Sequence, residues 1–220
     1  MLQAIDLKVT KSARFFVWGN PDANIEQVWF VCHGYGQLAS YFIKKFEVLD
    51  PQKYLVVAPE GLSKFYLDGL TGRVGATWMT KEDRLHEIGD YVAYLNTVYE
   101  RVHEEFNLKP LKTNILGFSQ GVATACRWIT MGTPHFDTLV AWAGNFPHDW
   151  DYVQAQELLE QKKVFFVVGD KDEFLQPQTL EAHLDFIKPK GIIPQVIHFA
   201  GRHELDSQVI KQLASRITQS

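Results

Sequence analysis

Residues 113–131, TNILGFSQGVATACRWITM, carry the strongest fold signal in the chain. The start of this stretch, 113–116, is an apolar run that predicts a buried strand, and 120–131 has the pattern of a helix. Between them lies GFSQG, residues 117–121, a Gly-x-Ser-x-Gly pattern whose small residues let two backbones pass closely at a tight turn. Such a turn raises the serine hydroxyl above the strand end, at the N-terminus of a helix. The stretch therefore predicts a strand–turn–helix unit that presents Ser119 as a nucleophile.

Strand-like apolar runs alternate with helix-like patterns along the whole chain of 220 residues. We expect strands at 2–9, 13–18, 28–32, 54–58, 113–116, 138–142, 164–168 and 195–199. We expect helices at 41–49, 84–106, 120–131, 151–161, 178–188 and 205–217. The first two strands are close together and predict an antiparallel hairpin, whereas the others are continuous apolar runs, typical of strands covered on both faces. The alternation predicts a single α/β domain over 1–220, with a mostly parallel central sheet of about eight strands and helices on both faces.

Composition and charge exclude several classes of function. The chain has 26 acidic and 22 basic residues, a formal net charge of −4, whereas a nucleic-acid-binding face needs a basic excess. No stretch approaches the ~18 consecutive apolar residues of a membrane span, and the N-terminus lacks the pattern of a secretory signal. Cys32 and Cys126 are interpreted as buried thiols rather than a disulfide or a metal site. We therefore expect a cytoplasmic protein with no nucleic-acid partner, no membrane span, and no metal or organic cofactor.

A second glycine turn, HGYG at residues 33–36, follows the expected strand 28–32 directly. Acyl-transfer enzymes stabilise an oxyanion with two backbone N–H groups. One comes from the residue after the nucleophile and the other from a loop after an earlier strand. These positions indicate the N–H groups of Gln120 and Tyr35 as the oxyanion hole, with a plain glycine turn as the alternative at 33–36.

A serine nucleophile needs a base, and the base needs an acid that orients it. On an elbow of this kind the acid follows the serine along the chain, and the histidine comes last. The acid is expected after the strand 164–168, where Asp170, Asp172 and Glu173 all compete for the role. The base is expected after the last strand, where His203 stands ahead of the last helix.

Taken together, these motifs resemble the phospholipase/carboxylesterase family of α/β-hydrolases, which includes the acyl-protein thioesterases. The resemblance runs from about residue 28 to the C-terminus and rests on HGYG at 33–36, GFSQG at 117–121, GDKD at 169–172 and His203. It implies the α/β-hydrolase fold. It also implies that Asp172, the second aspartate of Gly-Asp-x-Asp, is the acid, and Trp78 matches a tryptophan that the family carries before its long helix.

The chain departs from the family pattern at several places near these motifs. Gln37 stands where an aspartate often follows His-Gly-x-Gly, and Glu204 stands where a small residue commonly follows the histidine. Residues 173–175 replace the usual proline and small apolar residues. These departures do not change the expected catalytic chemistry, but the resemblance does not identify the substrate.

Segment 61–80 is long and glycine-rich and fits neither the helix nor the strand pattern. A loop of that length inside a compact domain is usually functional or disordered, so we expect a lid-like loop. The candidates to line an acyl site come from this segment and from the region of strand 138–142: Phe65, Tyr66, Trp78, Met79, Trp142 and Phe146. For each of them, packing onto the core is an equal alternative.

The combined expectation is a serine hydrolase that cleaves carboxylic ester or thioester bonds of a small-molecule substrate through Ser119, His203 and Asp172 and an acyl-enzyme intermediate. A peptidase or a lactonase with the same triad is an alternative, because the elbow serves all of these reactions. A non-catalytic binding module on the hydrolase scaffold is a weaker one. Metal-dependent hydrolysis by Asp170, Asp172 and His203 lacks a ligand-spacing motif. The sequence leaves a homodimer open.

Overall fold

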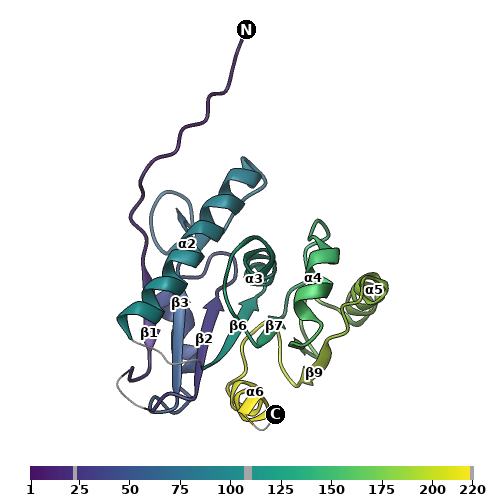
Figure 1. Cartoon of the computed structure of the whole chain (residues 1–220). Helices are drawn as coiled ribbons and strands as arrows, with labels where there is room; N and C mark the ends of the chain where they lie inside the picture. The colour runs from purple at the N-terminus through teal and green to yellow at the C-terminus, as the bar shows by residue number, and fades with distance from the viewer. Residues whose placement is uncertain (22–23, 107–110, 219–220) are drawn as a thin grey trace.

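A seven-stranded sheet forms the centre of the computed structural model, which describes residues 1–21, 24–106 and 111–218 (Figure 1). The strand order is β1-β3-β2-β6-β7-β8-β9. Only β1 runs antiparallel, against β3, and the other neighbouring strands are parallel. The strands are β1 (Phe15–Trp18), β2 (Gln27–Cys32), β3 (Tyr54–Pro59), β6 (Lys112–Phe118), β7 (Thr138–Trp142), β8 (Lys163–Gly169) and β9 (Gln195–Phe199). The expected α/β class and mostly parallel sheet are confirmed.

Helices cover both faces of this sheet. They are α1 (Ala39–Phe42), η1 (Ile43–Phe46), α2 (Arg84–Glu105), α3 (Gln120–Met131), α4 (Tyr152–Leu159), α5 (Pro177–Ile187), η2 (Lys188–Lys190) and α6 (Ser207–Thr218). One core lies under α2 to α5, and a second core lies under α1, η1 and α6. These bounds follow the predicted helices closely. Within the described residues, no helix is long and apolar enough to span a bilayer.

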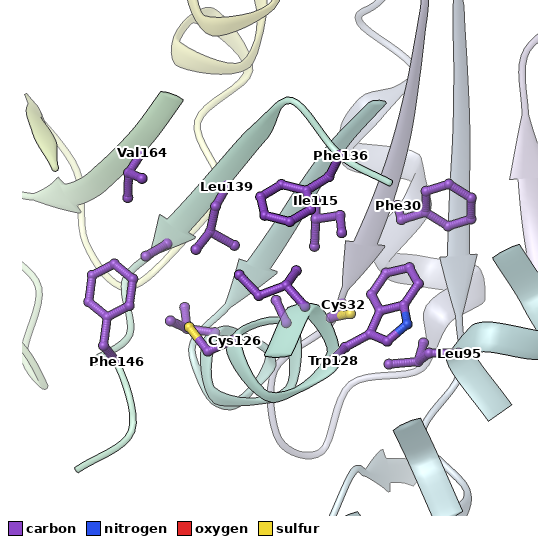
Figure 2. Packing of buried hydrophobic residues seen from close by; sticks show 14 of the residues in the cluster. Phe30, Cys32, Leu95, Ile115, Cys126, Trp128, Phe136, Leu139, Phe146 and Val164 are labelled. Carbon is purple, nitrogen blue, oxygen red and sulfur yellow. The ribbon is translucent and has the colours of Figure 1, made fainter. Parts of the chain in front are cut away.

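Each central strand contributes to both cores, because successive side chains of a strand point to opposite faces. In β2, Phe30 faces one core while Trp29 and Val31 face the other. Figure 2 shows Phe30 and other strand residues packed over Cys126 and Trp128 of α3. The two cysteines are free and buried, and burial raises the pKa of both thiols. A strand covered on both sides must be apolar throughout, which explains the continuous runs.

The expected first strand, at 2–9, is absent, which leaves seven strands rather than about eight. Residues 1–14 have no regular secondary structure. Ile5, Leu7 and Val9 alternate as in a strand, yet they are 76–84% exposed. A strand needs a neighbour to satisfy its backbone hydrogen bonds, and β1 pairs with β3 instead of with these residues. The predicted antiparallel hairpin of 2–9 with 13–18 is therefore wrong.

The segment 61–80 is not an irregular loop. It contains β4 (Ser63–Tyr66) and β5 (Val74–Thr77), which pair antiparallel as a separate two-stranded sheet. Leu67 N–H donates to Arg73 O at 2.8 Å and closes the turn between them. We call this unit, residues 63–77, the hairpin. Its position beside the strand ends of the main sheet brings it to the candidate site.

Candidate active site

Ser119 lies at the sharp turn between β6 and α3, as the sequence predicts. Its φ of 53° and ψ of −118° are unusual for a residue with a Cβ atom, and such strain is typical of functional turns. Two backbone hydrogen bonds hold the turn: Ser119 N–H donates to Trp142 O at 2.9 Å, and Val122 N–H donates to Ser119 O at 3.0 Å. The serine is half-buried at the end of the sheet.

The glycines on either side of the serine are required by backbone contact. A Cβ atom on Gly117 would lie 2.2 Å from Gly121 O, and one on Gly121 would lie 2.1 Å from Cys32 O. The strands β6 and β2 and the first turn of α3 therefore meet with no room for a side chain. The Gly-x-Ser-x-Gly spacing follows from this contact.

His203 and Asp172 form a hydrogen-bonded pair. His203 Nδ1 lies 2.8 Å from Asp172 Oδ2. Asp172 Oδ1 accepts the N–H groups of Phe174 at 2.8 Å and Leu175 at 3.0 Å. The carboxylate is buried and accepts on both oxygens, so Nδ1 of His203 is the nitrogen that donates to it, and in the neutral ring Nε2 is then the nitrogen without a proton.

The other two candidate acids lie elsewhere. Asp170 is exposed and faces His198, with 3.4 Å between the carboxylate and Nδ1. Glu173 is exposed. Of the three carboxylates that compete in the sequence, the structure brings only Asp172 to His203.

The loop that carries His203 is held by its neighbours. Trp142 Nε1–H donates to Glu204 O at 2.9 Å, and Lys171 N–H donates to Gly201 O at 2.9 Å. The imidazole packs against the rings of Phe118 and Phe174, at centroid distances of 5.0 and 4.7 Å. The side chain of His203 is 16% exposed. The imidazole of His203 is therefore held by packing on both sides.

The second glycine turn lies directly beside Ser119. A Cβ atom on Gly34 would lie 3.2 Å from Ser119 Cβ. Gly34 N–H donates to Gln37 Oε1 at 2.8 Å, so the glutamine that stands in place of the family's usual aspartate braces this turn. Within the described residues, Tyr35 N–H donates to no protein acceptor. The geometry leaves that donor available beside Ser119.

His33, the first residue of this turn, is a structural side chain. Its Nε2 accepts Gly61 N–H at 2.9 Å, and its Nδ1 lies 2.8 Å from Gly34 O. The ring therefore carries its proton on Nδ1 and is neutral. Burial lowers the pKa of His33 to about 4, against the opposing effect of the hydrogen bond to Gly34 O. The sequence offered only its glycine neighbours as a signal, and this role of the histidine was missed.

A cavity of about 670 Å³ opens next to His203 and the Gly36 end of the turn. Its walls are mainly apolar and include Leu38, Phe42, Leu67, Val74, Phe118 and Leu205. Three charged residues also border it: Lys45, Arg73 and Glu204. The contributions of α1 and η1 were missed at the sequence level, although the helix pattern directly after HGYG was a usable signal.

The six candidates for the acyl site, which include the exposed Tyr66, do not line this cavity. Phe65 is half-buried, with its ring 5.0 Å from that of Tyr35, and Met79 is half-buried. Trp78, Trp142 and Phe146 are buried, at 1%, 0% and 0% exposure. Because the side chains of Trp78, Trp142 and Phe146 are buried, they do not reach a ligand in the cavity.

These three buried aromatic residues support the site from behind. Trp78 Nε1–H donates to His33 O at 2.8 Å, while Trp142 binds the loop of His203 as described above. Phe146 stacks on Trp150 and His183, at 5.7 and 5.9 Å. All three therefore pack onto the core, which was the alternative interpretation for each of them. Within the described residues, no group of three or more His, Cys, Asp or Glu side chains could hold a metal ion.

Residues 27–208 match the family described as Serine hydrolase (FSH1). The chain belongs to the FSH1 serine hydrolase family. The matched region of this FSH1 hydrolase spans the glycine turn, the elbow, Asp172 and His203. Among curated proteins, none matches it significantly.

Solved structures share the fold of this FSH1 hydrolase at low sequence identity. Acyl-protein thioesterase 2 of Zea mays is 17% identical, with a TM-score of 0.67, covering 94% of this chain and 100% of that one. A carboxylesterase of Mesorhizobium loti is 14% identical, with a TM-score of 0.72, covering 92% and 94%. The Bacillus cereus carboxylesterase is 14% identical, with a TM-score of 0.66, covering 94% and 93%. The expected resemblance to the phospholipase/carboxylesterase type of α/β-hydrolase is confirmed.

Proposed function

We propose that this FSH1 hydrolase cleaves carboxylic esters or thioesters by two-step acyl transfer, with Ser119 as the nucleophile, His203 as the base and Asp172 as the acid. The observation that carries the proposal is the 2.8 Å contact of His203 Nδ1 with the buried Asp172 carboxylate. That contact leaves His203 Nε2 as the atom that can take a proton. The strained elbow, which presents Ser119 at the same end of the sheet, supports it.

In the first step His203 Nε2 takes the proton of the Ser119 hydroxyl as the oxygen attacks the carbonyl carbon. The backbone N–H groups of Tyr35 and Gln120 donate to the oxyanion that forms. His203 then gives its proton to the leaving alcohol or thiol, and water repeats the sequence to release the acid. The carboxylate of Asp172 stabilises the imidazolium through Oδ2, while its other oxygen accepts the N–H groups of Phe174 and Leu175.

The cavity beside His203 indicates the kind of acyl group. Its walls come from Leu38, Phe42, Leu67, Val74 and Leu205, and a volume of about 670 Å³ fits a small or medium apolar chain. The fold shared with the acyl-protein thioesterase and the carboxylesterases supports ester and thioester substrates.

Hydrolysis of p-nitrophenyl butyrate by Ser119→Ala tests the nucleophile. We expect kcat to fall at least about a thousand-fold, because the remaining groups cannot form the acyl-enzyme. A fluorophosphonate probe should label the natural protein and not the variant. Ser12→Ala, in the exposed N-terminal segment, is the control and should keep full activity and labelling. Undiminished turnover by Ser119→Ala would disprove the proposal.

A matched pair of variants tests the acid. Asp172→Asn should lower kcat about a thousand-fold or more, because the imidazole loses its orienting partner. Asp170→Asn should leave kcat within about twofold, because Asp170 faces His198 and not His203. Equal effects of the two would contradict the assignment. A parallel panel of thioesters, lactones and peptides shows whether the reaction is ester hydrolysis or one of the other reactions that the same triad serves.

A further inference from the structure

The structure assigns a second role to Gln120: we propose that its side chain, with Thr77 of β5, sets the spacing between the two halves of the oxyanion hole. The side chain of Gln120 acts as a positioning group. This role is separate from that of the Gln120 backbone N–H, which donates to the oxyanion. The inference rests on the proposed function, because it concerns how the two N–H donors of that reaction are held.

The two donors come from parts of the chain that are far apart in sequence. Tyr35 follows β2, whereas Gln120 opens α3. An oxyanion is stabilised only if both N–H groups converge on the same point, within about 3 Å of the oxygen. The backbones of the two turns already meet where Gly121 packs against Cys32, but Tyr35 lies beyond that contact, so a third element that binds both turns can fix the spacing of its N–H group from that of Gln120.

The strand β5 holds the first of these turns. Gly36 N–H donates to Ala76 O at 2.9 Å, and Ala76 N–H donates to Gln37 O at 3.2 Å. A Cβ atom on Gly75 would lie 2.4 Å from Gly36 O, so the backbones are in direct contact. The hairpin thus packs flat against the turn that carries Tyr35 N–H.

The end of β5 and the two residues after it hold the second turn. Gln120 Nε2–H donates to Met79 O at 2.9 Å and to Thr77 Oγ1 at 2.9 Å. Gln120 Oε1 accepts Trp78 N–H at 3.3 Å. Thr77 is 2% exposed and Gln120 is half-buried, so these bonds are partly shielded from water. One side chain therefore ties the N-terminus of α3 to three consecutive residues.

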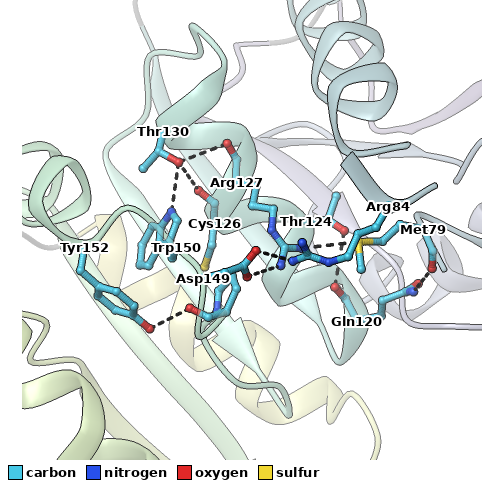
Figure 3. Close-up of polar contacts among 11 residues, drawn as sticks. Met79, Arg84, Gln120, Thr124, Cys126, Arg127, Thr130, Asp149, Trp150 and Tyr152 are labelled. Atoms are coloured by element: carbon cyan, nitrogen blue, oxygen red, sulfur yellow. Dashed lines mark hydrogen bonds and ion pairs between the residues drawn. The ribbon is translucent and has the colours of Figure 1, made fainter. Parts of the chain in front are cut away.

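Further contacts hold the same segment in place. Figure 3 shows Gln120 and Arg127, both on α3, reaching Met79, with Arg127 Nη1 3.7 Å from the Met79 sulfur. Trp78 Nε1–H donates to His33 O at 2.8 Å, which returns to the first turn. The path from Tyr35 to Gln120 therefore runs through residues 75–79, and we call this segment the clamp.

A pair of substitutions at Thr77 tests the clamp. Thr77→Val keeps the shape and removes the hydroxyl, so it should lower kcat for p-nitrophenyl butyrate about 10- to 100-fold, less than the loss of a whole oxyanion donor. KM should change less than about twofold, because the ground-state carbonyl depends little on the donors. Thr77→Ser keeps the hydroxyl and should retain at least about half of kcat.

The side chain of Gln120 provides the second arm. Gln120→Ala should lower kcat to a similar extent, and the double variant with Thr77→Val should be little worse than either single variant, because both remove one unit. Gln154→Ala is the control: Gln154 also lies in the first turn of a helix and donates from Nε2 to a backbone carbonyl, Thr130 O, at 2.9 Å. It should leave kcat unchanged.

A trifluoromethyl ketone that forms a tetrahedral oxyanion adduct separates positioning from general destabilisation. Its inhibition constant should rise in Thr77→Val by the same factor by which kcat falls. Suppose that the natural protein shows Ser119-dependent turnover and that Thr77→Val has the same kcat and the same inhibition constant. The role proposed for the clamp is then wrong, and the proposed function stands. If the natural protein shows no Ser119-dependent turnover, the proposed function fails and the clamp fails with it.

Discussion

The elbow and the hairpin contribute to the same site in different ways. The elbow, residues 117–121, is a short stretch of consecutive residues, and its two glycines are required because an added Cβ atom would lie 2.2 Å from Gly121 O at Gly117 and 2.1 Å from Cys32 O at Gly121. The hairpin acts through hydrogen bonds to the HGYG turn and to Gln120, residues distant from it along the chain. A local motif can therefore be recognised in a sequence, whereas a brace between distant loops becomes visible only when both loops are placed.

The difference also predicts how each region fails. A backbone contact leaves no room for adjustment, so a side chain at Gly117 or Gly121 of the elbow should disrupt folding itself. The bonds of the hairpin are made partly by side chains, so their loss should first affect the rate of reaction.

The largest effect is expected for Gly121→Ala in the elbow. The new Cβ atom would lie 2.1 Å from Cys32 O, and we expect a loss of at least about 3 kcal/mol in the free energy of unfolding, with no turnover. Urea denaturation followed by tryptophan fluorescence measures it. Gly89→Ala in α2 is the control: a Cβ atom there meets nothing within 4 Å, so this helix should gain about 0.5–1 kcal/mol. A Gly121→Ala variant of natural stability would show that the contact at the elbow is not rigid.

A smaller effect, a loss of stability at acidic pH, is expected from His33. His33 binds Gly61 N–H, and its pKa is about 4 in the folded protein, lowered by burial. An exposed imidazole in the unfolded chain has a pKa near 6.5. The unfolded state therefore binds the proton first, so stability is full above about pH 6.5 and falls as the pH drops towards 4. The titration of His33 should lower the free energy of unfolding by about 2 kcal/mol between pH 7.5 and pH 5.

Urea denaturation at pH 7.5 and pH 5 measures this dependence. His33→Asn should reduce the difference between the two pH values, whereas His135→Gln, at an exposed histidine, should not. His183 contributes in the same direction, because burial lowers its pKa to about 4 as well. An NMR titration of the natural protein is independent of the variants: a His33 ring that protonates near pH 6.5 would contradict the burial argument.

The smallest effect is expected at Asp149, which accepts from Arg127 at 2.8 Å and from Arg84 (Figure 3). Partial burial raises the pKa of Asp149, but the two guanidinium groups outweigh it and hold the pKa at about 2. The stabilisation is therefore present above about pH 4 and lost as the pH falls towards 2. Half of the side chain is exposed, so Asp149→Asn should cost less than about 1 kcal/mol at pH 7.

The same unfolding measurement at pH 3 checks the sign. There the difference between Asp149→Asn and the natural protein should shrink. Asp90→Asn is the control, because Asp90 is an exposed residue of α2 that forms no ion pair within the described residues. A difference that grows in acid would show that the arginines do not hold this carboxylate.

Much of the fold was predictable because buried strands and amphipathic helices have distinct periods. The helix of 120–131 and the strand of 138–142 have the predicted bounds. The strand at 2–9 was predicted wrongly for the same reason. Alternation shows that a segment can form a strand, but it does not show that a neighbouring strand is present to pair with it. The hairpin was missed because its strands are short and its glycines resemble those of a loop.

The strand–turn–helix around Ser119, the order of the candidate groups along the chain and the position of His203 after the last strand were predictable from the residues alone. These are local properties, because close backbone passage demands glycine and a buried strand demands continuous apolar residues. The folded chain was needed to show that Asp172 and not Asp170 contacts His203. It was also needed to show that Trp78 and Trp142 support loops instead of lining the cavity, and that β5 contacts both glycine turns. Each of these depends on burial and on contacts between distant residues, which no single stretch of sequence contains.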